Sequence, residues 1–135
     1  MRKTTILRYT PHEKYLEAPC SAVAVGCALD NRGICQSPVF FGEIKEDGYL
    51  TLDAANRFIR KFLTVEKKTY FRRAERISLE EFLEENRKEC IICVRGHYLY
   101  AKENAYWSFF ENDGDDVICV WYLAPVRKAD METEK

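Results

Sequence analysis

The stretch Ala18-Pro19-Cys20-Ser21-Ala22-Val23-Ala24-Val25-Gly26-Cys27-Ala28-Leu29 decides the fold, because it carries no charge before Asp30. A helix that is apolar all round belongs inside a protein, so this stretch predicts a short buried helix. Pro19 suits the first helical position, since the amide that proline lacks would have no intrahelical partner there. The following run, Asp30-Asn31-Arg32-Gly33, predicts the end of the helix at a glycine.

Cys20 lies at the N-terminal end of this predicted helix. Free amides and the helix dipole favour an anion at that place, which lowers the pKa of a thiol and makes it a nucleophile. The alternative interpretation is a small buried hydrophobic residue, as we expect for Cys27. Whether the chain is an enzyme therefore depends on a base that faces Cys20.

Length and composition restrict the class of protein. The 135 residues are 47% hydrophobic, and 21 Lys and Arg stand against 22 Asp and Glu, for a net charge of −1. We expect one α+β domain over residues 1–127, with residues 128–135 as a charged, disordered tail. A balanced charge argues against nucleic-acid binding, and no apolar run is long enough to span a membrane. The N-terminus lacks the apolar segment of a signal peptide, so we expect a cytoplasmic protein; the oligomeric state stays open.

The order of elements predicts a helical half followed by an antiparallel sheet, hence the α+β class. The first 17 residues predict an irregular arm with a short strand at 5–8, and residues 34–50 predict a loop with a short extended piece. An amphipathic helix begins after Thr51, and a second, short surface helix follows the capping box formed by Ser78 and Glu81. The predicted strands cover residues 68–73, 90–94, 97–103, 105–110 and 117–123, with a turn at 112–116.

Six cysteines are many for a chain without a signal peptide, and we interpret them as free thiols, mostly in the core. Cys90 and Cys93 have CxxC spacing but lie in a predicted strand, where residues three apart point to opposite faces. The two thiols are therefore poorly placed to bind one metal ion. A redox or metal protein is the weakest interpretation. The acidic residues 111–116 lack the ligand spacing of a calcium loop, so we predict a solvated turn.

His97 opens a predicted hairpin directly after Gly96. If residues 103 and 104 form its turn, His97 shares a face with Ser108 and Asn112, and either could orient the imidazole as a Cys-His hydrolase requires. A register shifted by one residue would bring other side chains round instead. These alternatives are Trp107, Glu111 and Asp113. For His97 itself, the alternative to a base is a hydrogen-bonded histidine in a strand.

Three segments together resemble the small papain-like cysteine peptidases, especially those of phages and bacteria. They are Cys20-Ser21-Ala22-Val23-Ala24-Val25-Gly26-Cys27-Ala28, Ile77-Ser78-Leu79-Glu80-Glu81-Phe82-Leu83, and Gly96-His97 with the strands after it. The resemblance covers residues 17–123. It implies a papain-like fold, a thiolate at Cys20, a base at His97 and an acidic or amide residue on the next strand, with no metal or organic cofactor.

The chain departs from the family pattern at two places. Ser108 stands where an Asp is usual, and no Gln or Asn precedes Cys20 to donate a hydrogen bond to the oxyanion. The backbone amide of Cys20 remains as a donor, with His12, Lys14 or Tyr15 as substitutes. Losing one such donor costs roughly 100- to 1000-fold in rate.

Two functions follow as expectations. In the first, Cys20 attacks a peptide or isopeptide bond, His97 transfers the proton, and Ser108 or Asn112 holds the imidazole. In the second, the same fold has lost catalysis and binds a partner protein through its aromatic hairpin and acidic turn. That hairpin carries eight aromatic residues, of which alternation turns about half away from the core. They are Tyr98, Tyr100, Tyr106, Trp107, Phe109, Phe110, Trp121 and Tyr122.

Overall fold

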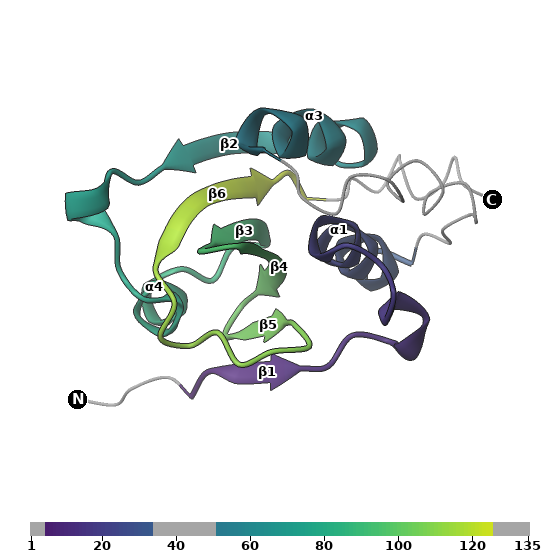
Figure 1. Cartoon of the computed structure of the whole chain (residues 1–135), viewed down its shortest axis with the longest axis horizontal. Coiled ribbons are helices and arrows are strands. Elements are labelled where there is room, and N and C mark those ends of the chain that lie inside the picture. Colours follow the sequence, from purple (N-terminus) through teal and green to yellow (C-terminus); the bar gives the residue numbers. More distant parts are fainter. Residues whose placement is uncertain (1–4, 34–50, 126–135) are drawn as a thin grey trace.

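The computed structural model describes residues 5–33 and 51–125 (Figure 1). The predicted loop at 34–50 and the predicted tail at 128–135 lie outside these residues. In chain order the elements are β1 (Leu7–Tyr9), the 3-10 helix η1 (Glu13–Tyr15), α1 (Cys20–Asn31), α3 (Leu52–Phe62), β2 (Val65–Tyr70), the 3-10 helix η2 (Arg73–Glu75), α4 (Leu79–Glu85), β3 (Cys90–Val94), β4 (His97–Lys102), β5 (Ala105–Trp107) and β6 (Val117–Leu123).

The strands form one sheet of six among the described residues, in the order β1-β5-β4-β3-β6-β2. The α+β class is thus confirmed, but the expected purely antiparallel C-terminal sheet is wrong. The sheet is mixed, because β1 runs parallel to β5, and both edge strands precede the four central strands in the chain (Figure 1). A three-residue strand with exposed side chains carries no signal of its partner or direction, so sequence order alone favours the simpler arrangement.

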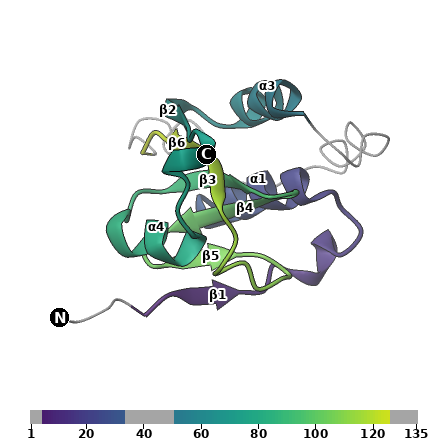
Figure 2. The same cartoon turned by 60° about the vertical axis from the view of Figure 1, so that its left-hand side comes forward.

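Helices cover both faces of the sheet (Figure 2). Alternation along each strand divides the core into two clusters. Ile91, Tyr100 and Trp121 pack with α1 and α3, whereas Ile92 and Leu99 pack with α4 on the opposite face. Most of the contacts of α1 with the sheet are to β4. The first residue of α1, Cys20, and the first residue of β4, His97, line the same cavities.

The buried helix α1 agrees with the prediction in all but its first residue. Nine consecutive residues, 21–29, are buried, and Gly33 follows the helix with a φ of 73°. Pro19 is the N-cap rather than the first helical residue, so Cys20 occupies that position instead. The φ of Pro19 is −59° but its ψ is 148°, an extended value that a proline adopts as easily as a helical one.

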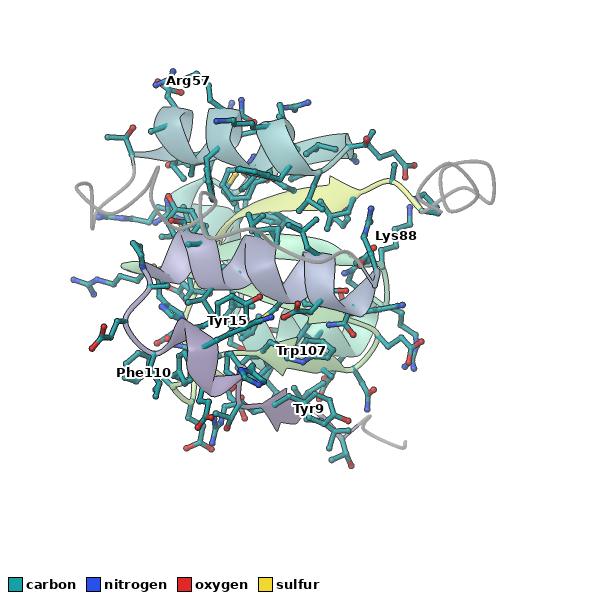
Figure 3. The ribbon with its side chains drawn as sticks, turned by 90° about the vertical axis from the view of Figure 1, so that its right-hand side faces the viewer. Tyr9, Tyr15, Arg57, Lys88, Trp107 and Phe110 are labelled. Carbon is teal, nitrogen blue, oxygen red and sulfur yellow. The ribbon has the colours of Figure 1, made fainter. Side chains whose placement is uncertain are left out.

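Gly26 of α1 leaves no room for a side chain, because the ring of Tyr15 packs against it. Figure 3 shows Tyr15 beside α1. A Cβ added there would lie 2.6 Å from the ring of Tyr15, which is fully buried and whose hydroxyl donates to Asp30 over 2.7 Å. Alanine is the better helix former by about 1 kcal/mol. The overlap outweighs this gain, so we expect Gly26→Ala to lower the free energy of unfolding by about 1–3 kcal/mol in urea titration.

The matched control for this substitution is Gly114→Ala. A Cβ on Gly114 meets no atom within 4 Å, so its free energy of unfolding is expected to stay within about 0.5 kcal/mol of the parent chain. A Gly26→Ala chain as stable as the parent would show that Tyr15 moves freely, contrary to the tight packing described above.

The two amphipathic helices begin where the sequence predicts. Thr51 caps α3 by accepting a hydrogen bond from the amide of Ala54, and Ser78 caps α4 by accepting from the amide of Glu81. The predicted apolar stripe of α4 is buried, and that of α3 packs into the core. The predicted edge strand at 68–73 is confirmed as β2, but it lies at 65–70, three residues earlier.

The β4–β5 hairpin has the register that the site prediction assumes. Lys102 pairs with Ala105, and Ala101 pairs with Tyr106, around a turn in which Glu103 has a φ of 58°. The shifted alternative is therefore wrong. The ladder ends at Trp107, earlier than the predicted strand end at 110, so the segment after β5 leaves the sheet as a loop.

Candidate active site

Cys20 and His97 open onto the same two cavities. One cavity, of about 340 Å³, is lined by both residues together with Thr51, Leu52 and Ile118. The other, of about 350 Å³, is lined by both residues together with aromatic and aliphatic side chains. These are Leu16, Ala18, Val23, Tyr98, Trp107, Phe109 and Phe110, with Ser108 beside them. The first turn of α1 and the beginning of β4 thus carry a thiol and an imidazole into one shared space.

Cys20 differs from the other described thiols in its exposure, since it is partly exposed and they are buried. Burial raises the pKa of Cys27 and of Cys93 to about 12 and also raises the pKa of Cys90 and Cys119. These four cysteines are the core residues that the sequence predicts, whereas Cys35 lies outside the described residues. A thiol with a pKa that high is a poor nucleophile near neutral pH.

His97 is half-buried at the first position of β4, directly after a turn at Gly96 with a φ of 69°. Its ring packs edge-on against Phe110 with 5.7 Å between the ring centroids. Burial lowers the pKa of His97, and the negative charge of Asp115 opposes that shift. Burial thus favours the neutral imidazole, which is the form that can accept a proton from a thiol.

Both predicted orienting residues are joined to His97. The Nε2 atom of His97 lies 3.0 Å from Oγ of Ser108, and Ser108 donates its hydroxyl hydrogen to Oδ1 of Asn112 over 2.7 Å. Ser108 and Asn112 are buried. The sequence left these two residues as alternatives, and the fold uses them in series because the chain turns back after β5.

The loop at 108–116 is held by contacts that the sequence analysis missed. Nδ2 of Asn112 donates to the carboxylate of Asp115 over 2.8 Å, and the hydroxyl of Tyr106 donates to Asp113 over 2.6 Å. The amides of Leu79 and Glu80, in the first turn of α4, donate to the carbonyl oxygens of Asp115 and Asp113. First-turn amides lack intrahelical partners, so a helix start is well suited to fix a loop in this way.

The predicted solvated turn at 111–116 is thus partly wrong, because Asn112 is buried and Asp113 and Asp115 are hydrogen-bonded. A signal for this was present in the sequence, since an Asn followed by two Asp residues favours local side-chain hydrogen bonds. Glu111 and Asp116 are exposed, as predicted. Of the other residues considered for orienting the imidazole, Asp113 accepts a hydrogen bond from Tyr106 instead.

None of the three predicted substitutes for the oxyanion donor lines either cavity among the described residues. The Tyr15 hydroxyl binds Asp30 at the far end of α1, and Lys14 pairs with the same carboxylate over 3.1 Å. His12 is exposed and caps η1 through its Nδ1 atom. Expecting them at the site was wrong; the Cys20 amide, at the first helical position, remains.

Cys90 and Cys93 lie on opposite faces of the sheet, as strand geometry predicts. Cys90 packs with the cluster under α4 and Cys93 with the cluster under α1. Over residues 5–33 and 51–125, the structure contains no group of three or more His, Cys, Asp or Glu side chains arranged to hold a metal ion. The same residues contain no helix long and apolar enough to cross a membrane.

The aromatic hairpin is divided much as alternation predicts. Tyr98, Tyr100, Tyr106 and Trp121 are buried, and Trp107, Phe109 and Tyr122 are half-buried. Phe110 is 65% exposed, and the neighbouring cavity wall includes Leu16, which is 68% exposed. Figure 3 shows Phe110 and Trp107 on the same side of the molecule, below α1. The rim of the aromatic cavity is therefore accessible to a bound molecule.

Fold and site together define an α+β protein with a thiol and an imidazole in one cleft. The chain matches no protein-family model, no curated protein and no solved structure at a significant level.

Proposed function

We propose that this chain is a cysteine hydrolase of the papain-like type that cleaves a peptide or isopeptide bond. One observation carries the proposal: Cys20, at the beginning of α1, and His97, at the beginning of β4, line the same two cavities. A thiol at a helix N-terminus beside an oriented imidazole is the arrangement that nucleophilic catalysis by cysteine needs. The hydrogen bond between His97 and Ser108 supports the proposal, because this chemistry requires an oriented imidazole.

The reaction proceeds in two halves. His97 accepts the proton of Cys20, and the Cys20 sulfur forms a bond to the carbonyl carbon of the substrate, whose oxygen becomes an oxyanion held by the Cys20 amide. The carbon–nitrogen bond then breaks, and His97 gives its proton to the leaving amine. Water next attacks the thioester with His97 again as the base, which releases a carboxylic acid and restores the thiol. The two cavities receive the parts of the substrate on either side of this carbonyl.

A second candidate is a papain-like binding module without catalysis. The exposed Phe110 and Leu16 favour it, because apolar side chains grouped at the rim of a cavity are typical of a surface that binds a partner protein. The two departures from the peptidase pattern also favour it. The two candidates differ in what they require of Cys20, since only the hydrolase needs a thiolate near neutral pH.

The test is the pH dependence of Cys20 alkylation by iodoacetamide, followed residue by residue with mass spectrometry. In a Cys-His pair the thiolate persists well below the unperturbed pKa of about 8.5. We expect Cys20 to react at about pH 6, and His97→Ala to slow this reaction by about tenfold or more, because the thiolate then loses its imidazolium partner.

Two controls belong to this experiment. His12→Ala removes the only other histidine of the chain and is expected to leave the Cys20 profile unchanged. Cys27, which is buried with a raised pKa, is expected to stay unmodified in every folded variant and so reports unfolding. A Cys20 that is inert, or that titrates like a free thiol with and without His97, would exclude the hydrolase and favour the binding module.

A further inference from the structure

We infer that Asp115 fixes the protonation state of His97 through a one-way chain of hydrogen bonds, which leaves Nδ1 as the atom that takes the proton of Cys20. The chain joins His97, Ser108, Asn112 and Asp115, and we call it the His97–Asp115 chain. This inference rests on the proposed function and adds to it a positioning residue, Asp115, that the sequence analysis did not name.

The donor and acceptor of each hydrogen bond in the His97–Asp115 chain follow from its last member, Asp115. An ionised carboxylate can only accept hydrogen bonds, so the side-chain atom of Asn112 that lies 2.8 Å from Asp115 must be the NH2 group. The amide oxygen of Asn112 then faces Ser108 at 2.7 Å and can only accept, so the Ser108 hydroxyl must donate to it. A carboxylate at one end thus determines which way each amide and hydroxyl points.

The remaining contacts of Ser108 complete the argument. Its hydroxyl has one hydrogen, which is given to Asn112, and it accepts a hydrogen bond from the amide of Phe110 over 3.1 Å. The only role left toward His97 is that of an acceptor, so Nε2 of His97 carries a hydrogen and donates it over 3.0 Å. A neutral imidazole with its hydrogen on Nε2 has a free lone pair on Nδ1.

Burial of Ser108 and Asn112 keeps these hydrogen bonds in place. Ser108 is 2% exposed and Asn112 is 6% exposed, so neither can exchange its partner for bulk water without leaving a buried polar group unpaired. The loop itself is fixed, because the amides of Leu79 and Glu80 hold the backbone of Asp115 and Asp113. The His97–Asp115 chain is thus anchored to the first turn of α4, a helix on the opposite side of the sheet from α1.

The His97–Asp115 chain accounts for the serine at the position where the resembling family has an Asp. The carboxylate is present here, but three hydrogen bonds away from the imidazole, so it orients His97 and stabilises the imidazolium at longer range. The other ionisable side chains that line the cavities with His97 are Cys20, Cys93 and Tyr98. Cys93 and Tyr98 have raised pKa values and stay neutral near pH 7, so Asp115 supplies the nearby negative charge.

The experiment is 15N NMR of the imidazole rings, in which two-bond couplings identify the protonated nitrogen and a titration gives the pKa. The chain has only two histidines, and a His12→Ala background leaves the His97 signals alone. We expect the neutral form of His97, at the alkaline end of the titration, to show one tautomer, with hydrogen on Nε2. Asp115→Ala is expected to produce both tautomers and to lower the pKa of His97, because the orienting acceptor and its negative charge are both lost.

Asp115→Asn retains a side-chain oxygen that can accept and removes only the charge. It is expected to lower the pKa of His97 and to slow Cys20 alkylation at about pH 6 by roughly three- to tenfold, which corresponds to half to one pKa unit. Asp116→Asn removes a charge from the exposed neighbour and is expected to change neither quantity. Should Asp115→Ala fail to fold by circular dichroism, the Asn variant carries the test.

A His97 with its hydrogen on Nδ1 in the folded protein would overturn the inference. So would a His97 whose tautomer and pKa are the same with and without the Asp115 carboxylate. Failure of the proposed function is a separate result, since Cys20 would then be inert while the NMR experiment still decides the direction of the His97–Asp115 chain. A reversed tautomer with a reactive Cys20 would instead leave the hydrolase standing and remove Asp115 from it.

Discussion

Replacement of Trp121 by alanine is expected to lower the free energy of unfolding by about 3–5 kcal/mol. Trp121 is fully buried in the middle of β6 and is the largest side chain among the fully buried residues. Its indole nitrogen donates to Asn56 of α3 over 3.0 Å, and its ring lies 6.1 Å from that of Tyr98. The substitution therefore leaves a large cavity between the sheet and α3, and it also removes the hydrogen bond that joins them.

Urea denaturation followed by fluorescence measures this effect, because Trp107 is the second of the two tryptophans and remains as a probe. Trp121→Phe serves as the control and is expected to cost less, since most of the apolar volume stays and Asn56 keeps its hydrogen bond from Arg60. Equal stabilities for the alanine and phenylalanine variants would mean that packing of the ring does not hold α3 on the sheet.

Glu89→Ala is the second large effect, with an expected loss of about 3–5 kcal/mol in the free energy of unfolding. Glu89 accepts hydrogen bonds from Arg32, which follows α1, and from the hydroxyl of Tyr100 on β4. The side chains of Arg32 and Glu89 are only 10% and 14% exposed. Removing the carboxylate leaves a mostly buried guanidinium with the carbonyl of Ala124 as its remaining partner, together with a buried hydroxyl that must find another acceptor.

The matched comparison is the exposed ion pair of the same chain, between Lys14 and Asp30, whose side chains are 43% and 36% exposed. Lys14→Ala is expected to cost about 1 kcal/mol or less in the same urea titration. The double variant Arg32→Met with Glu89→Leu removes both charges, and it is expected to regain much of the stability lost by Glu89→Ala. If the single and double variants were equally unstable, the uncompensated charge could not be the cause.

The site combines features that favour catalysis with features that weaken it. A partly exposed thiol at the beginning of α1 and a hydrogen-bonded imidazole share two cavities, whereas none of the three substitutes expected for the missing upstream amide lines either cavity. Alkylation of Cys20 measures the Cys-His pair without a known substrate. It is thus the experiment on which the choice between hydrolase and binding module depends.

Local pattern was enough to predict most elements. Periodicity and caps predicted α1, α3 and α4 with errors of one or two residues at their ends, and the apolar runs at 90–94 and 117–123 predicted β3 and β6. These signals are local, because a cap or an apolar stripe involves residues within one or two helical turns. The strand pairings of β1 and β2 could not be predicted this way, since their partners lie about 50–100 residues away.

The sequence by itself determined which residues could do chemistry: a cysteine at the beginning of an apolar helix, a histidine that opens a hairpin, and Ser108 and Asn112 on the face that the two-residue turn selects. The tertiary structure alone decided that Cys20 and His97 share a cleft and that Asp115 ends the hydrogen-bond chain from His97. The reason is physical. Side-chain alternation and capping act within a few residues, whereas the packing of α1 on β4 and the anchoring of the loop at 108–116 by α4 join segments far apart in the chain.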